Sequence, residues 1–171
     1  IAGLWKGLKD LYAIGFIDRL PRLISAQAEG CHPINRAIAE NRPWQPMEEN
    51  TLADSIAVGV PRNADKALMA IRESHGLVVN VSDEEIMAAQ KLLGMTCGVF
   101  GEPAGVTGTA GVKKLCEQGI IGKNDTVVSV VTGNGLKDVA NAIKFCGEPM
   151  KLPNDLSLLT AEFDRRGIVT D

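Results

Sequence analysis

The sequence predicts an α/β fold in three layers, in which a mostly parallel sheet is flanked by helices. Short β-branched runs bounded by glycine or proline alternate along the chain with longer stretches of helical periodicity, and this alternation is typical of βαβ units. A chain of 171 residues is long enough for one domain with a sizeable core. No apolar run approaches about 20 residues, so we expect no membrane-spanning helix.

The first half of the chain contains two predicted helices and one clear strand. Residues 1–15 form a helix that ends at glycine, and residues 21–28 form a strand. Residues 33–41 form a short helix that begins at proline, a favoured first helical position. A polar loop with two prolines, 42–50, follows, and residues 51–58 are compatible with either a strand or a short helix.

The middle of the chain repeats the alternation. A helix begins at Asn63 or Asp65 by its cap chemistry and runs to about Ser74, and residues 77–81 form a strand. The sequence from Ser82 to Glu85 is a capping box, which starts a helix that ends at about Leu93. A helix of small residues covers 102–118.

The last predicted strand and helix cover residues 126–131 and 136–145. After Gly147 the chain carries prolines and loses its periodicity, so we expect a tail that covers the surface or binds a partner chain. The sequence therefore divides into a domain at 1–147 and a C-terminal tail at 148–171.

The opening of the chain is unusual. Ile1 begins directly in a helical pattern, and nothing that resembles an N-cap precedes it. Because the first four amides of a helix need partners, we expect this to be an incomplete piece of a longer fold.

Charge and cysteine content exclude several classes of function. Eighteen basic and 21 acidic residues are interleaved and give a net charge of −3, so neither nucleic acid nor a membrane is an expected partner. The four cysteines are widely spaced, without a CxxC motif, which favours free thiols over a metal site. Free thiols and the absence of a visible secretory leader predict a cytoplasmic protein.

The segment 127–138 is the most informative part of the sequence. A β-branched run ends at Thr132, and Gly133 and Gly135 then bracket Asn134 before a polar helix start. Ligands of open α/β sheets bind outside the carboxyl ends of the strands, and glycines allow the backbone to approach a ligand closely. The Thr132 hydroxyl could then donate or accept a hydrogen bond there. An ordinary glycine turn between a strand and a helix is the alternative.

Five motifs that occur in order carry a resemblance to a known family. They are Gln-Ala-Glu-Gly at 27–30, Thr-Leu-Ala-Asp at 51–54, Val-Ser-Asp-Glu-Glu-Ile at 81–86, Glu-Pro-Ala-Gly at 102–105 and Thr-Gly-Asn-Gly-Leu-Lys-Asp at 132–138. This order and spacing resemble the C-terminal half of the threonine synthases, which are fold-type II pyridoxal-phosphate (PLP) enzymes. Residues 1–7 also look like the helix that follows the family's glycine-rich phosphate loop.

The resemblance implies a fold, a reaction and partners. The fold would be the large domain of the tryptophan-synthase-β-like enzymes. The reaction, of the carbon–oxygen lyase class, would convert O-phospho-L-homoserine and water to L-threonine and phosphate with PLP as cofactor. The family's catalytic lysine and most of its substrate-phosphate site would lie in an upstream half. The chain alone would then be inactive, and the intact protein would be a homodimer.

The resemblance also implies four cofactor-binding residues. Thr132 matches the residue whose hydroxyl meets the pyridine nitrogen, and Gly133 follows it in the same turn. Glu102 matches a glutamate near the pyridine edge, although a plain helix-capping carboxylate is an alternative. Ala53 matches a small residue beside the ring, although a core alanine is equally compatible. No metal site and no catalytic residue are expected in this chain.

Two other functions fit the residues less well. A threonine or serine dehydratase of the same fold would favour serine or cysteine at the Thr132 position and an added regulatory domain. A non-catalytic α/β module that binds a small anion or a partner chain is the alternative from a different class.

Overall fold

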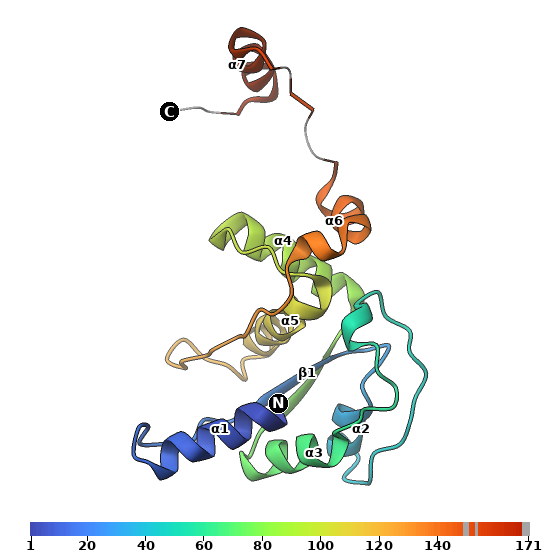
Figure 1. Cartoon of the computed structure of the whole chain (residues 1–171), viewed down its shortest axis with the longest axis vertical. Helices are drawn as coiled ribbons and strands as arrows, with labels where there is room; N and C mark the ends of the chain where they lie inside the picture. Colours follow the sequence, from blue (N-terminus) through green and yellow to red (C-terminus); the bar gives the residue numbers. More distant parts are fainter. Residues whose placement is uncertain (149–150, 153, 169–171) are drawn as a thin grey trace.

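The computed structural model of the chain describes residues 1–148, 151–152 and 154–168, and its centre is a two-stranded parallel sheet. The elements, in order, are α1 (Ala2–Ala13), β1 (Ile24–Ala28), α2 (Pro33–Ala39), η1 (Asp54–Ile56), α3 (Ala64–Glu73), β2 (Leu77–Val81), α4 (Asp83–Cys97), α5 (Pro103–Glu117), η2 (Gly135–Lys137), α6 (Val139–Cys146) and α7 (Leu156–Arg166), where η marks a 3-10 helix. Helices cover both faces of the sheet (Figure 1), so the three-layer α/β fold is confirmed.

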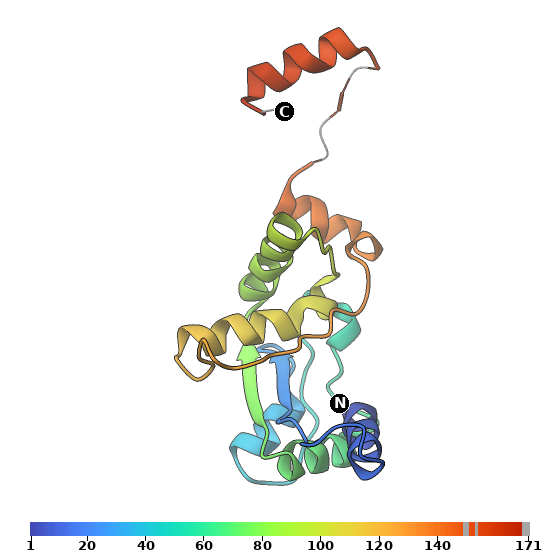
Figure 2. The same cartoon turned by 90° about the vertical axis from the view of Figure 1, so that its left-hand side faces the viewer.

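Helix α5 covers one face of the sheet and crosses both strands (Figure 2). Ala26 and Val79 are register partners in the middle of the two strands, and Gly111 of α5 lies directly on them. A Cβ at Gly111 would come within 2.8 Å of Val79 Cγ1 and 2.9 Å of Ala26 Cβ. The helix can approach the sheet this closely only because position 111 has no side chain.

Helices α2 and α3 cover the other face. Their apolar side chains form a cluster with Val78, whereas Val79 and Val81 point toward α5, as the two-residue period of a strand requires. A buried polar contact joins the α2 layer to the sheet: the Asn35 side-chain amide donates to the Val79 carbonyl oxygen at 2.9 Å and to Asn80 Oδ1 at 2.8 Å.

Several helix boundaries agree with the predictions from the sequence. The capping box is present, with the Glu85 amide donating to Ser82 Oγ at 3.2 Å and the Ser82 amide to Glu85 Oε2 at 2.7 Å. Proline occupies the first turn of α2, and the ambiguous segment 51–58 contains the short helix η1 rather than a strand. Asn63 precedes α3 as expected, but its side chain makes no capping hydrogen bond.

The predicted strand at 126–131 is wrong. These residues run extended along α5 (Figure 2) without joining the sheet. Thr109 and Ser129 share a hydroxyl–hydroxyl hydrogen bond of 3.0 Å, whereas Val128 and Val130 on the opposite side are 85% and 62% exposed. The β-branched pattern is typical of a strand, but a strand also needs another strand to pair with through its backbone. In the described structure α5 contacts this segment instead.

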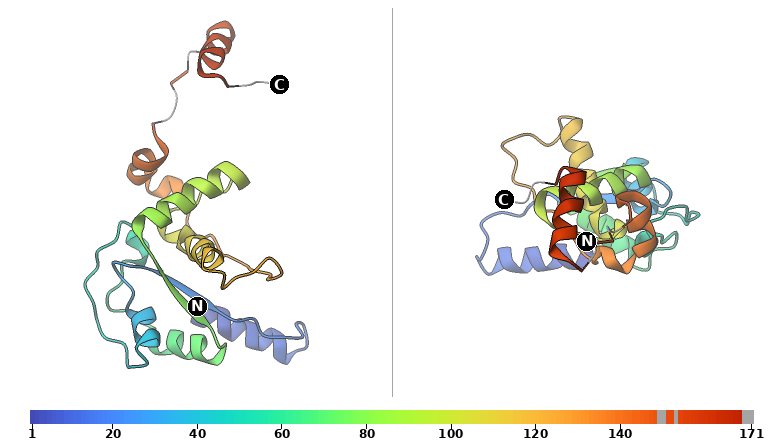
Figure 3. Two further views of the ribbon diagram at one scale, coloured as in Figure 1. Left: turned by 180° about the vertical axis from the view of Figure 1, so that it is seen from behind. Right: turned by 90° about the horizontal axis from the view of Figure 1, so that it is seen from above.

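The predicted helix at 136–145 is divided in two. Asp138 is not helical (φ −124°, ψ 69°), and its carboxylate accepts a hydrogen bond from the Asn141 amide, so it ends η2 and caps α6. The expected loss of periodicity after Gly147 is wrong for 156–166, which form α7. Figure 3 shows α7 standing apart from the sheet and its helices. Residues 149–150, 153 and 169–171 of the predicted tail lie outside the described residues.

Replacing Gly111 with alanine should destabilise the protein, although alanine is the better helix former. Alanine gains about 1 kcal/mol of helix propensity over glycine, but overpacking a core costs about 1–3 kcal/mol. Urea denaturation should therefore show a net loss for Gly111→Ala. Gly7→Ala in α1 is the matched control, because no atom lies within 4 Å of the added Cβ, and it should gain stability. Equal gains for both variants would contradict the close packing of α5 on the sheet.

Candidate functional site

The start of α5 meets the glycine turn at 132–135, and two backbone hydrogen bonds hold them together. The Glu102 amide donates to the Gly133 carbonyl oxygen, and the Gly135 amide donates to the Phe100 carbonyl oxygen, both at 2.9 Å. An isolated antiparallel bridge joins Gly101 and Asn134 between them. The sequence placed Glu102 and Gly133 in one site, and the structure brings them into contact.

Glu102 is a buried carboxylate with an unusual environment. It is only 7% exposed, and as N-cap of α5 its side chain makes no capping hydrogen bond, so the helix-capping interpretation is wrong. The side chain instead lies against Gly133, where an added Cβ would be 2.0 Å from Glu102 Oε1. Only glycine fits at position 133 while Glu102 keeps this position. Lys137 Nζ lies 3.3 Å from the other carboxylate oxygen, Oε2.

Thr132 lies beside this contact. Its backbone carbonyl carbon and the Gly133 nitrogen pass 3.2 Å and 3.3 Å from the place where a Cβ on Gly105 would be. The turn therefore rests on the first turn of α5. The Thr132 side chain is exposed, and within the part of the chain that the structure describes its hydroxyl has no hydrogen-bond partner. That hydroxyl is available to a ligand as donor or acceptor.

Ala53 belongs to the hydrophobic core, the alternative that the sequence left open. It is 1% exposed and shares a cluster with residues of β2, α4 and α5. Its loop is tied to the start of α4, because Asp83 accepts hydrogen bonds from the Thr51 hydroxyl and, at 3.0 Å, from the Leu52 amide. A place for Ala53 beside a cofactor ring stays a prediction.

Gln90 is a site residue that the sequence analysis missed. It comes from α4, is fully buried, and donates through Nε2 to the Gly101 carbonyl oxygen at 2.7 Å. This hydrogen bond therefore anchors Gly101, the residue before Glu102, to α4. Its Oε1 is buried without a partner among the described residues. The available signal was a glutamine on the inward face of an amphipathic helix, where an apolar residue is usual.

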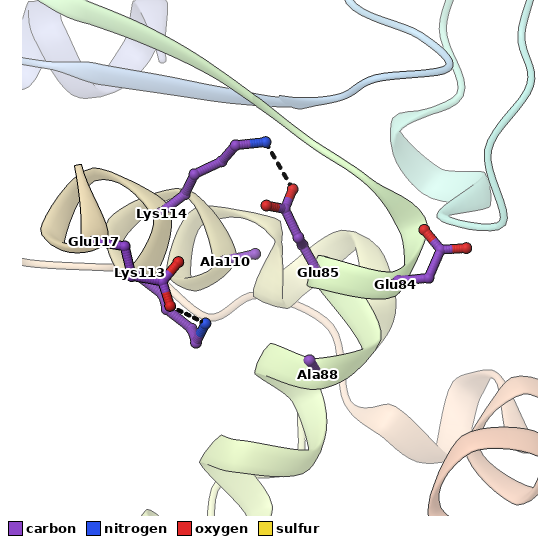
Figure 4. A pocket seen from close by; sticks show the side chains of 7 residues that line it. All are labelled: Glu84, Glu85, Ala88, Ala110, Lys113, Lys114 and Glu117. Atoms are coloured by element: carbon purple, nitrogen blue, oxygen red, sulfur yellow. Dashed lines mark hydrogen bonds and ion pairs between the residues drawn. The ribbon is translucent and has the colours of Figure 1, made fainter.

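A pocket of about 210 Å³ between α4 and α5 is not the functional site (Figure 4). Lys114 lines this pocket and pairs with Glu85 at 2.9 Å and Glu29 at 3.3 Å. Burial raises the pKa of Glu85, but hydrogen bonds from Lys114 and the Ser82 amide outweigh it and leave the pKa below its ordinary value. The Glu85 hydrogen bond is the main reason that the pKa of Lys114 is raised. These charges are paired with one another and connect α4, α5 and the residue that follows β1.

Comparison with known proteins identifies the class of protein. Residues 1–133 match the family described as "Pyridoxal-phosphate dependent enzyme", and the chain belongs to this family. The cofactor of the family is PLP. The fold is similar to that of maize serine racemase, with a TM-score of 0.50 and 22% identity over 63% of this chain and 31% of that one.

Within the family the chain is similar to threonine synthases, which confirms the resemblance seen in its motifs. It is 43% identical to threonine synthase of Methanocaldococcus jannaschii over 93% of this chain and 40% of that protein. Identity is 45% with the enzyme of Methanosarcina acetivorans, over 87% and 37%, and 37% with that of Mycobacterium tuberculosis, over 91% and 41%. The chain therefore spans about 40% of the length of these relatives.

The residues at the start of α5 fit one edge of PLP. A pyridine nitrogen accepts a hydrogen bond, and the Thr132 hydroxyl is an exposed donor. A Cβ at Gly133 would collide with Glu102 and one at Gly135 with Phe100, so only glycines allow this turn to pack so closely beside the Thr132 hydroxyl. The buried Glu102 carboxylate, with a single lysine as its ionic partner in the described structure, adds a charged group whose burial needs a reason.

Gln90→Glu should destabilise the protein more than Gln90→Met. A carboxylate cannot donate to the Gly101 carbonyl oxygen, and it would bury a charge where neutral Gln90 is fully buried. We expect a loss of about 3 kcal/mol or more in unfolding free energy at pH 7. Methionine removes the hydrogen bond together with the unpartnered Oε1, so its loss should stay near 1 kcal/mol in the same urea titration. Equal losses would show that Gln90 acts through its volume alone.

Lys114→Met should lower the free energy of unfolding by up to about 1 kcal/mol at pH 7. The loss is this small because the Lys114–Glu85 pair is partly exposed and screened by solvent. Glu85 has a lowered pKa, so its stabilising contribution is present above the ordinary carboxylate pKa and is lost as the pH falls through the lowered value. The difference from wild type should therefore shrink below about pH 4. Lys113→Met, which removes an exposed ion pair on α5, is the control and should change little at either pH. If the stability difference between Lys114→Met and wild type stayed constant from pH 7 to 3, it could not come from the ion pair with Glu85.

Proposed function

We propose that residues 1–147 form the C-terminal part of the PLP-binding domain of a threonine synthase, followed by a tail at 148–171. The intact enzyme would convert O-phospho-L-homoserine and water to L-threonine and phosphate, a reaction of the carbon–oxygen lyase class. The observation that carries the proposal is the contact between the Thr132–Gly133 turn and the buried Glu102 carboxylate. The similarity to threonine synthases over about 90% of the chain supports it.

Each residue of the contact would have a separate task. Thr132 would donate its hydroxyl hydrogen to the pyridine nitrogen and, being neutral, would leave that nitrogen without a counter-charge. Glu102 would place a negative charge near the same edge, and Gly133 allows both to lie in one turn. When bound, PLP would supply the electron-withdrawing ring, and the protein would tune that ring by these contacts.

The proposal requires a second part of the enzyme. An upstream half would supply the catalytic lysine, the phosphate loop and most of the substrate-phosphate site, so residues 1–171 alone would not turn over substrate. We also propose that the intact protein is a homodimer. Exposed apolar side chains on and just after α1 support a covered surface there; they include Leu4, Tyr12 and Phe16, at 51%, 50% and 77% exposure.

The test is an assay of the intact protein that carries this sequence, purified with PLP. Release of phosphate from O-phospho-L-homoserine with equimolar L-threonine would support the proposal. Formation of a 2-oxo acid from L-threonine or L-serine, without phosphate release, would identify a dehydratase instead. A protein that shows no bound PLP and acts on none of these three substrates would be a non-catalytic module. Residues 1–171 expressed alone are the control and should be inactive.

Thr132→Val in the intact enzyme should reduce turnover strongly, because it removes the proposed donor to the ring while nearly keeping the shape. An unpaired buried polar group costs about 1–3 kcal/mol, which corresponds to a loss of about 5- to 150-fold in turnover. Thr132→Ser keeps the hydroxyl and should lose much less. Steady-state kinetics and the product ratio of both variants show whether Thr132 is a donor to the ring or only part of a turn. Wild-type turnover in Thr132→Val would make the segment an ordinary glycine turn.

A further inference from the structure

Lys137 makes an ion pair that the proposed function does not use. Its Nζ lies 3.3 Å from Glu102 Oε2, and the two side chains differ greatly in exposure, at 63% for Lys137 and 9% for Glu102. Within the described structure Lys137 is the only cation paired with Glu102. Because a buried carboxylate without a partner is strongly disfavoured, this ammonium group is what compensates the charge of Glu102.

The backbone holds Lys137 in place for this contact. The last residue of η2 is Lys137, whose amide donates to the Asn134 carbonyl oxygen at 3.0 Å, while the Asn134 side chain accepts from the Leu136 amide at 2.9 Å. These hydrogen bonds fix the backbone of Lys137, which lies five residues after Thr132 on the same turn. Only its side chain has to be ordered when the ion pair forms.

The ion pair closes a loop of contacts around the glycine turn. On one side the Glu102 amide donates to the Gly133 carbonyl oxygen at 2.9 Å. On the other side the Glu102 carboxylate lies between Gly133 and Lys137. Glu102 thus holds the turn that carries Thr132 through both its backbone and its side chain. Lys137 keeps the Glu102 side chain turned toward Gly133.

We propose that Lys137 is a positioning residue for cofactor binding. By holding the Glu102 carboxylate against Gly133, it fixes the turn that presents the Thr132 hydroxyl. This inference rests on the proposed function, since it concerns how the same site receives PLP. Lys137 itself need not touch the cofactor or the substrate.

The experiment compares Lys137→Met with Lys137→Arg in the intact enzyme, first freed of PLP and then titrated with it. We expect the PLP dissociation constant, measured by fluorescence titration of the apoenzyme, to rise about tenfold for Lys137→Met, which is the lower end of the range for losing a charged hydrogen bond. Lys137→Arg retains the cation and should stay within about twofold of wild type. The visible absorbance spectrum of bound PLP should shift in Lys137→Met and not in Lys137→Arg.

Two further measurements separate positioning from a merely structural role. In a Glu102→Gln background, Lys137→Met should weaken PLP binding by less than about twofold, because the pair is already broken. A crystal structure of apo Lys137→Met should show the Glu102 carboxylate turned away from Gly133. Lys113→Met removes an exposed ion pair elsewhere and should bind PLP as wild type does.

The outcomes also separate this inference from the proposed function. If wild type binds PLP, and Lys137→Met binds it with unchanged affinity and spectrum, the positioning role is wrong and the proposed function stands. A lower melting temperature with unchanged PLP affinity would likewise assign Lys137 a structural role only. If the wild-type intact protein shows no PLP binding at all, the proposed function itself fails.

Discussion

The close approach of α5 to two neighbours is the constraint on which the rest of this structure depends. Gly111 brings the helix onto the middle of the sheet, and Gly105 brings it against the turn at 132–133. These glycines are six positions apart, so at about 100° per residue they lie on different faces of one helix. The sheet and the candidate site are therefore placed relative to each other by a single rigid element.

The candidate site departs from the usual rules of packing. Elsewhere in the described chain the core is mostly apolar, and its buried polar residues, such as Asn35 and Ser74, are neutral. At the start of α5, by contrast, the buried group is a carboxylate: Glu102 is 7% exposed and is the only charged residue among the buried residues of the described chain. Natural proteins tend to break such rules where function requires it, and this favours the α5 start over the pocket beside Lys114 as the site.

The two candidate regions also differ in how they use charge. In the pocket between α4 and α5, one lysine serves two carboxylates, and their hydrogen bond lowers the pKa of Glu85 and raises that of Lys114, as in a structural ion pair. In the glycine turn, one lysine serves one buried carboxylate, and a threonine hydroxyl beside it has no partner among the described residues. The first arrangement is complete in itself, whereas the second leaves a donor for a ligand.

The sequence by itself determined the α/β class, the capping box at Ser82, the proline start of α2 and the residues that meet at the α5 start. The class, the capping box and the proline start follow from local chemistry, because caps, periodicity and turn residues act over a few positions. The residues at the α5 start were predicted from the resemblance of five ordered motifs to a known family. Only the tertiary structure decided that 126–131 runs along α5 rather than in the sheet, that Glu102 does not cap its helix, that Gln90 donates to Gly101 and that Lys137 pairs with Glu102. Each of these depends on contacts between residues distant in the sequence or on the path of a side chain, which short-range patterns do not encode.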